Sequence, residues 1–413
     1  MKVKLLFLFL FFSSLNVFSQ TKILFEANKA QSAGNADWVI DSDLNNLGFS
    51  NGSGISGTGS ESNPQRIPTL NQSGITSGTL ETYWKGGLSA WAIDCVKQGY
   101  IVETLPNNGL ITYGNSSNPQ DLSNYKVYVT DEPNISYTAL EKDAIINFVS
   151  NGGGLLMISD HDVSDRNGDG VDSPTILNDL MLNNTVHSNP FGINFNLLSI
   201  SPNSTNIANL PTNTILHGNS GNVSQVIWSA GTSMTLNTNN NASVRGLIYT
   251  NGSSNTGIIN VLCAQATYNL GKVVAFGDSS IADDGTGDTG DTLYDGYYTD
   301  ANGNHQKLLV NAIIWLAGSN LSTNDFSDSN LNFSVNPNPI DDNVLKINFN
   351  ESYSEPISLE VIDTLGRIIE SEIINATNYE NSKNINLNNL NSGLYFCKLS
   401  SLSFSQTRSF IIK

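Results

Sequence analysis

Basic residues, histidines and cysteines are all scarce in this 413-residue chain. It holds 19 Lys and Arg against 37 Asp and Glu, so the formal net charge is -18. Because a protein that binds nucleic acid needs basic patches to neutralise phosphates, we do not expect a nucleic-acid partner. The three cysteines, Cys95, Cys263 and Cys397, are an odd number and lie far apart. This spacing argues against both a disulfide scaffold and a zinc site.

Long apolar runs are also missing. The N-terminal stretch "MKVKLLFLFLFFSSLNVFSQ" has two lysines, an apolar run at 5–12 and small residues near its end. This pattern is typical of a secretory signal peptide over residues 1–20, with cleavage near Ser19 or Gln20. A transmembrane anchor is the alternative, but it needs about 20 apolar residues. No other stretch is long and apolar enough, so we expect no transmembrane segment.

Residues 21–318 alternate short apolar strands with amphipathic helices. Such alternation predicts an α/β domain with a parallel sheet that is covered on both faces. The expected strands are 22–27, 100–105, 125–133, 155–160 and 271–280, and the expected helices are 79–99, 138–154 and 305–318. Short alternating runs such as "RGLIYT" and "IINVLCAQATY" within 191–270 predict antiparallel additions to this sheet.

A different pattern fills the C-terminal fifth of the chain. Residues 319–330 are rich in Ser, Asn and Asp and predict a solvated linker. Residues 331–413 consist of short alternating strands that are separated by Asn, Gly and Pro turns. We therefore expect a second domain, an all-β sandwich, from 331 to 413.

Most central strands of the α/β domain are followed by an acid. In an open parallel sheet the ligand crevice lies beyond the carboxyl ends of the strands. The candidate catalytic residues at these ends are Glu132, Asp160, His161 and Asp278. They could hold a catalytic divalent metal that activates water, with one carboxylate as general base. Aspartate also favours turns for purely local reasons, and that reading stays open.

One loop, "SDHDVSDRNGDGVDS" at 159–173, concentrates aspartates around a single arginine. Its second half has the spacing of a calcium loop, with a glycine at 170 that permits a sharp turn. The expected Ca²⁺ ligands are Asp165, Asn167, Asp169, Val171 and Asp172. The bidentate Glu of a true EF-hand is missing, because Ile176 stands at the twelfth position. The alternative is a loop of Asx turns with solvated acids.

The C-terminal segment resembles a known family. The stretches "NPNP" (336–339), "VIDTLGRII" (361–369), "LNSGLYFCKL" (390–399) and the terminal "FIIK" resemble the type A C-terminal sorting domain of the type IX secretion system. The resemblance implies that the Bacteroidetes type IX machinery is a partner. It also implies that the protein is secreted, extracellular or attached to the outer-membrane surface. An ordinary carbohydrate-binding sandwich is the alternative.

Residues 21–318 resemble the class I glutamine amidotransferase-like superfamily, nearest to its trehalose-utilisation-like branch. The segments "ILFEANKAQSAGNADWVID", "VTDEPNISYTALEKDAIINFVSNGGGLLMISDHDVSDRNGDG" and "GKVVAFGDSS" carry this resemblance, which implies a flavodoxin-like layout. True amidotransferases have a nucleophilic cysteine in a tight elbow, and neither Cys95 nor Cys263 falls at one. The family's catalytic triad therefore cannot be transferred to this chain.

Two functions fit these observations. The first is a secreted, metal-assisted hydrolase or carbohydrate-active enzyme with an acidic pocket, acting on a polysaccharide or another extracellular polymer. The second is a non-catalytic, calcium-stabilised surface binding protein. Geometry separates them: an enzyme requires Glu132, Asp160, His161 and Asp278 to converge, whereas a binding protein does not.

Overall fold

The computed structural model describes residues 20–41, 71–287, 291–318, 333–349, 357–363, 367–374, 382–387, 390–400 and 405–413. The chain divides into two compact units, Met1–Ser319 and Asn320–Lys413, and each is described by itself. The expected linker at 319–330 and the expected signal peptide, except Gln20, lie outside the described residues. Both stay predictions.

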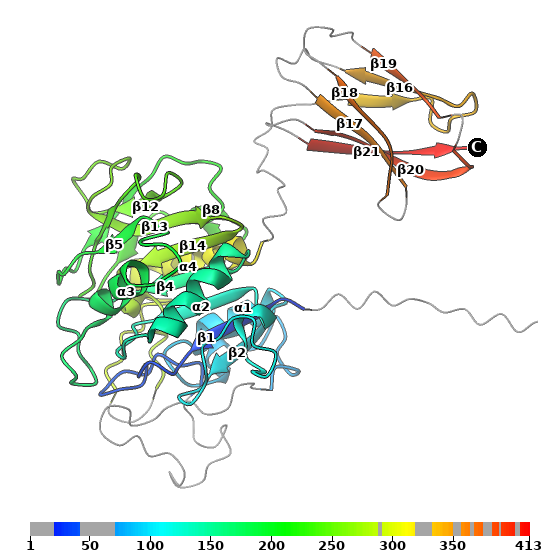
Figure 1. The fold of residues 1–413 in the computed structure, drawn as a ribbon. Helices are drawn as coiled ribbons and strands as arrows, with labels where there is room; N and C mark the ends of the chain where they lie inside the picture. Colours follow the sequence, from blue (N-terminus) through cyan, green and yellow to red (C-terminus); the bar gives the residue numbers. More distant parts are fainter. Residues whose placement is uncertain are drawn as a thin grey trace, which may run out of the picture. The chain divides into compact units, whose positions relative to one another are not determined.

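The first unit is built on a mixed sheet (Figure 1). Five parallel strands are ordered β2-β1-β3-β4-β14. They are β1 (Lys22–Glu26), β2 (Ile101–Leu105), β3 (Val127–Asp131), β4 (Gly154–Ile158) and β14 (Gly271–Phe276). All five expected parallel strands are confirmed. Every residue of β3 and β4 is buried, which explains why these strands read as continuous apolar runs.

Antiparallel strands extend the sheet beyond β14, as expected for 191–270. The order continues β14-β13-β11-β5, and β12 pairs with β13 and β7. These strands are β5 (Ile193–Phe195), β7 (Asn206–Ile207), β11 (Met234–Leu236), β12 (Arg245–Tyr249) and β13 (Val261–Tyr268). Two small ribbons pair β6 (Asn203–Ser204) with β10 (Val226–Ile227) and β8 (His217–Gly218) with β9 (Gly221–Asn222).

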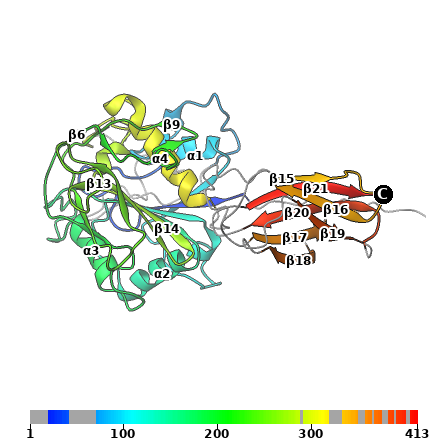
Figure 2. The same ribbon diagram turned by 90° about the horizontal axis from the view of Figure 1, so that it is seen from above.

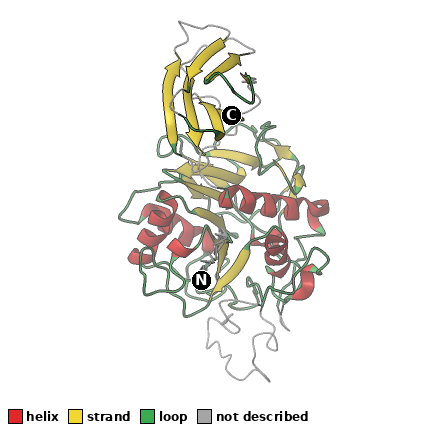
Figure 3. Cartoon of the chain, turned by 90° about the vertical axis from the view of Figure 1, so that its right-hand side faces the viewer, coloured by secondary structure: helices red, strands yellow, loops and turns green. Residues whose placement is uncertain are grey.

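Helices cover both faces of the sheet (Figures 2 and 3). One side carries α1 (Ser89–Lys97) and α4 (Asn304–Ala317), and the other carries α2 (Ala139–Ser150) and α3 (Ser173–Leu182). Helix α2 begins with a capping box, in which the Thr138 hydroxyl accepts from Glu141 N and Glu141 Oε2 accepts from Thr138 N. Short 3₁₀ turns complete the unit: η1 (Glu81–Tyr83), η2 (Leu122–Asn124), η3 (Ser279–Ile281) and η4 (Asp300–Gly303).

The prediction of one helix over 79–99 is wrong at its N-terminal half, because α1 begins only at Ser89. Two glycines explain the difference. A Cβ atom on Gly86 would lie 2.4 Å from the Val39 carbonyl oxygen. Gly87 N donates to the Asp37 carbonyl at 2.7 Å. The backbone at 86–87 therefore packs directly on the segment after β1 and cannot continue a helix.

The second unit is an antiparallel all-β region, as predicted. One sheet contains β15 (Phe333–Asn336), β16 (Val344–Phe349) and β19 (Ser382–Asn386), and the other contains β18 (Ile368–Ile374), β17 (Ile357–Asp363), β20 (Gly393–Ser400) and β21 (Ser405–Ile412). Residues of both sheets, including Phe333, Leu359 and Phe410, share one hydrophobic core. In β17 buried and half-buried residues alternate, as expected for a strand with one face in the core.

Among the residues that the structure describes, no helix is both long enough and apolar enough to cross a bilayer.

Candidate active site

The candidate site lies where the strand order of the parallel sheet reverses. Strand β1 is flanked by β2 on one side and by β3 on the other, which makes this edge the topological switch point at which α/β sheets bind ligands. Five carboxylates follow or end strands at this edge, and each residue is at most 3% exposed: Glu26, Asp131, Glu132, Asp160 and Asp278. Burying so many carboxylates costs free energy unless they are paired or protonated, so the partners of each carboxylate decide how the cluster is tolerated.

Glu132 and Asp160 are joined by one hydroxyl group. Ser164 Oγ lies 2.8 Å from Glu132 Oε1 and 2.7 Å from Asp160 Oδ2, and Ser279 Oγ donates to Glu132 Oε2 at 2.8 Å. The guanidinium of Arg166 forms an ion pair with each acid, through Nε to Glu132 Oε1 at 2.5 Å and Nη2 to Asp160 Oδ2 at 3.6 Å. The backbone of Glu132 is left-handed, with φ of 42°. Arg166 thus places a fixed positive charge between two predicted site residues.

Asp160 and Asp131 have perturbed acidity. Burial, followed by the charges of Glu132 and Asp278, raises the pKa of Asp160 well above its ordinary value. Burial and the neighbouring acids, Glu132 first, raise the pKa of Asp131 well above its ordinary value as well. Among the described residues, neither carboxylate oxygen of Asp131 has a hydrogen-bond partner. Burial and the neighbouring charges thus shift both groups toward the protonated form, and the charge of Arg166 opposes this shift at Asp160.

Asp278 also joins the cluster, although its hydrogen bonds are structural. Its side chain caps η3, where Oδ1 accepts from Ser280 N at 2.9 Å, and Oδ2 accepts from Ser229 N at 2.6 Å. Burial raises its pKa to about 7. Asp278 therefore acts on Asp160 and Asp131 chiefly through its charge.

His161 lies at the exposed side of the cluster. Its side chain is 27% exposed, and its Nε2 is 3.9 Å from Asp160 Oδ2. Its Nδ1 is 2.5 Å from the carbonyl oxygen of Asp162, and we assign the proton to Nδ1 because the carbonyl can only accept. This assignment leaves the Nε2 lone pair free. Glu132, Asp160, His161 and Asp278 thus lie near one another, as the enzyme hypothesis requires.

The segment after β1 contributes to the same site. Asn35 Oδ1 accepts from Arg166 Nη1 at 3.0 Å, and the guanidinium carbon of Arg166 lies 5.9 Å from the centre of the Trp38 ring. Glu26, by contrast, is fully engaged: Tyr128, Tyr137 and Gln31 all donate to its carboxylate. Glu26 therefore looks structural, and Arg166 is the residue that links the loops.

The aspartate loop has a regular internal hydrogen-bond pattern. Asp165 accepts from the backbone N–H groups of Gly168, Asp169 and Gly170 at 2.8, 3.1 and 2.7 Å. Asp169 Oδ1 accepts from Val171 N at 2.9 Å, and Asn167 Oδ1 accepts from Asp169 N at 3.2 Å.

The end of the loop is tied to a helix. Asp172 caps α3 by accepting from Thr175 N at 3.0 Å, and its other oxygen accepts from Val163 N at 2.9 Å. These contacts explain the conformation of the loop without an ion. Calcium binding by Asp165, Asn167, Asp169, Val171 and Asp172 therefore stays a prediction.

Among the described ranges, no group of three or more His, Cys, Asp and Glu side chains is arranged to hold a metal ion. At the candidate site, both oxygens of Glu132 already accept hydrogen bonds. The cation that lies between Glu132 and Asp160 is the Arg166 guanidinium.

The catalytic residues predicted from the sequence do not include four residues of this site: Asp131, Ser164, Arg166 and Ser279. Of these, Asp131 and Ser279 are recognisable from the sequence as residues at the ends of expected strands. Asp131 precedes Glu132 at the end of β3 and carries the same strand-end signal. Arg166 is the single arginine of the acidic loop, and a lone cation among acids was a usable signal. Nothing in the local sequence indicates that Ser164 and Ser279 would reach Glu132 from separate loops.

Comparison with known proteins identifies the second unit. A family model described as a secretion system C-terminal sorting domain matches residues 334–413. This domain marks the chain as a secreted or cell-surface Bacteroidetes protein that interacts with the type IX secretion machinery. The match does not include residues 21–318, so the glutamine amidotransferase-like resemblance of the first unit stays a prediction.

The other comparisons give fold-level likenesses only, and the search of curated proteins found no match. The mmIFT52 N-terminal domain is 12% identical, covers 57% of this chain and 92% of its own, and has a TM-score of 0.40. A cytoplasmic protein from Salmonella typhimurium is 14% identical, with coverages of 56% and 87% and a TM-score of 0.33. A DUF3244-family protein with an immunoglobulin-like β-sandwich fold from Bacteroides vulgatus is 15% identical, with coverages of 21% and 88% and a TM-score of 0.18. We draw no functional conclusion from similarities at these TM-scores.

Proposed function

We propose that the first unit is a secreted hydrolase that acts on an extracellular polymer by acid–base catalysis. The observation that carries this proposal is the convergence of Asp160, His161 and Glu132 at the switch point of the sheet. Catalytic sites gather buried titratable groups whose environments shift their pKa values, because proton transfer requires groups that are poised to give or take a proton. A purely structural cluster would satisfy every carboxylate, and Asp131 is unsatisfied.

The proposed roles follow from protonation. Asp160, whose pKa is raised by burial, is the general acid that donates a proton to the leaving group. His161 presents a free Nε2 lone pair at the exposed side and accepts a proton from the attacking water. Glu132, Ser164 and Arg166 position Asp160 through the shared hydroxyl and the ion pairs. The catalytic divalent metal suggested by the sequence is replaced in this proposal by the fixed charge of Arg166.

The fold-family assignment is part of the same proposal. The order β2-β1-β3-β4-β14 is the 2-1-3-4-5 order of flavodoxin-like sheets, which supports a flavodoxin-like, amidotransferase-like layout. The chemistry differs from that of amidotransferases. Burial raises the pKa of Cys95 and of Cys263 well above the ordinary thiol value, so neither is a reactive thiolate. We therefore do not propose glutaminase activity.

The test is a substrate screen of the full chain with soluble polysaccharides, chromogenic glycosides and aryl esters. Asp160→Asn and His161→Gln are each expected to lower kcat by about 10²- to 10⁴-fold on the substrate found. Asp143→Asn, at a half-buried aspartate on α2 outside the site, serves as the matched control and should retain full activity. Full activity in both site variants would remove the proposal. Absence of turnover on every substrate class would favour the calcium-stabilised binding protein.

A further inference from the structure

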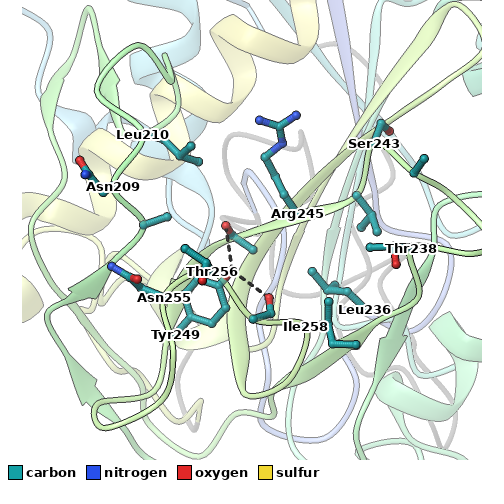
Figure 4. Close-up of a pocket in the computed structure, with 15 residues that line it drawn as sticks. Asn209, Leu210, Leu236, Thr238, Ser243, Arg245, Tyr249, Asn255, Thr256 and Ile258 are labelled. Atoms are coloured by element: carbon teal, nitrogen blue, oxygen red, sulfur yellow. Dashed lines mark hydrogen bonds between the residues drawn. The ribbon is translucent and has the colours of Figure 1, made fainter.

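A pocket outside the acidic site is formed by the antiparallel additions to the sheet (Figure 4). It is a cavity of about 340 Å³ between β11, β12, the residues after β7 and the turn at 255–258. Its volume lies at the small end of the range for ligand pockets, roughly 300–1,000 Å³. It shares no residue with the acidic site, so a second ligand would not compete with the substrate of that site for contacts.

The charge of the pocket is opposite to that of the protein. The chain carries 37 acidic against 19 basic residues. None of the fifteen lining residues is acidic, and the single charged one is Arg245. Arg245 is exposed at the start of β12, and it forms no ion pair or hydrogen bond through its guanidinium with any residue that the structure describes. Most other cations of the first unit are engaged, for example Lys29 with Glu141 and Lys142 with Asp179.

The rest of the lining is mixed. Ile258 and the half-buried Leu210 supply accessible apolar surface, and Leu236 and Tyr249, each 2% exposed, form the floor behind them. The Tyr249 hydroxyl donates to the Gly257 carbonyl at 3.0 Å. The dashed lines in Figure 4 mark the hydrogen bonds of the Tyr249 hydroxyl to the Gly246 and Gly257 carbonyl groups. The exposed Asn209 and Thr238 have side chains with no hydrogen-bond partner in the described part of the chain, so an amide and a hydroxyl are available to a ligand.

The tyrosine surface is fixed by a close backbone approach. A Cβ atom on Gly246 would lie 2.5 Å from the hydroxyl oxygen and the adjacent ring carbon of Tyr249. Tyr249 itself is 2% exposed and packs in the core. The pocket therefore has a preorganised wall, which lowers the cost of ordering when a ligand binds.

We propose that this pocket binds a uronate, that is, a monosaccharide residue bearing a carboxylate. A guanidinium is the side chain best suited to pair with a carboxylate, because its planar fork can make two parallel hydrogen bonds. A sugar ring has apolar C–H faces that suit the leucine, tyrosine and isoleucine surface, and hydroxyls that suit free amide and hydroxyl groups. The absence of acids from the lining removes the repulsion that the remainder of this acidic protein would exert.

Isothermal titration calorimetry on the full chain tests the proposal with D-galacturonate, D-glucuronate, D-galactose and acetate at constant ionic strength. A uronate is expected to bind at least tenfold more tightly than galactose or acetate. Arg245→Gln should weaken uronate binding about tenfold and leave galactose unchanged. Ala242→Leu, which fills the lining at an exposed position, should weaken uronate binding without removing charge.

The matched control is Lys307→Gln, which removes one positive charge from α4, outside the pocket. It should leave uronate affinity unchanged, and thermal melting should show that every variant is folded. Uronate binding that is undetectable, equal to that of galactose or acetate, or insensitive to Arg245→Gln would overturn the proposal. The inference does not rest on the catalytic roles given to Asp160 and His161. Uronate binding should survive in Asp160→Asn.

Discussion

Two groups of acidic residues lie close together in this protein and have opposite environments. The loop at 165–172 is exposed at its tip and half-buried elsewhere except at the buried Asp172, and the carboxylates of Asp165 and Asp169 accept hydrogen bonds from the loop's own backbone. The cluster of Asp131, Glu132, Asp160 and Asp278 is buried, and its members come from the ends of three strands. The sequence draws attention to the first group because its aspartates are adjacent. The proposed catalytic residues lie in the second group, whose members are scattered along the chain.

The comparison shows that density of charge along a sequence is a weak guide to reactivity. An exposed carboxylate that caps its own loop keeps water and backbone donors close, so its charge is tolerated. A buried carboxylate near other carboxylates must be paired or protonated, and this requirement is what shifts a pKa. Arg166 connects the groups: it belongs to the loop in sequence and to the buried cluster in its contacts.

Removing Arg166 should have the largest effect on this contrast. Arg166→Met leaves Glu132 and Asp160 buried without their cation, and such a loss costs about 3–5 kcal/mol in the free energy of unfolding. Urea denaturation at pH 7 measures the change. Arg245→Met, at an exposed arginine without a partner among the described residues, is the control and should change stability by less than about 0.5 kcal/mol. Equal effects of the two substitutions would show that the Arg166 pairs do not stabilise the cluster.

Calcium should act on the exposed group alone. If the loop binds Ca²⁺, an ion concentration one hundredfold above Kd should stabilise the fold by about 2.7 kcal/mol, and chelation should reverse the gain. Asp165→Ala removes the acceptor of three loop N–H groups and should abolish the calcium-dependent rise in Tm.

The control for calcium is Asp143→Ala, an aspartate whose carboxylate accepts from Thr185 instead. It should retain the full calcium response. A Tm that is indifferent to calcium in the parent protein, or a rise that persists in Asp165→Ala, would assign the loop to Asx turns alone.

The pH dependence of stability should also distinguish the two groups. The pKa of Asp131 is raised in the folded state above its ordinary value of 3.8. Below that value both states are protonated and the group has no effect. Above it the unfolded chain loses the proton and the folded chain keeps it, so stability falls as pH rises. Asp131→Asn removes one such group and should flatten this fall by about 1.4 kcal/mol per pH unit.

Denaturation at several pH values between 4 and 7 follows this slope. Asp169→Asn, in the exposed loop, should leave it unchanged. A parent slope that matches the Asp131→Asn slope would mean that Asp131 ionises in the folded protein, and its place in the cluster would need revision.

The parallel strands of the first unit were predictable because each is a short run of mostly buried residues, and β3 and β4 show this most clearly. The beginning of α1 was not predictable, because helical spacing in 79–99 conceals the contact of Gly86 with the Val39 backbone. Helix α3 was also missed, although Asp172 and Pro174 form a normal helix start. The loop's aspartates drew the interpretation toward a metal instead.

The candidate site was predictable to the extent that topology decides it. Acids after parallel strands must meet at one edge of the sheet, and Glu132, Asp160 and Asp278 do. The partners were not predictable, because Ser164, Ser279 and Arg166 reach Glu132 through loop conformations that no period in the sequence encodes. Which carboxylate stays protonated depends on burial, and burial is a property of the assembled fold.

The left-handed backbone at Glu132 has one more consequence. Such a conformation in a residue with a Cβ atom costs on the order of 1–3 kcal/mol, and glycine would adopt it at little cost. A stabilising redesign that scores backbone geometry alone would therefore choose Glu132→Gly, and it would delete the carboxylate that anchors Ser164, Ser279 and Arg166. Because the loss of these buried contacts costs more than the relieved strain returns, the substitution should lower both stability and activity, and engineers of the protein should leave this position untouched.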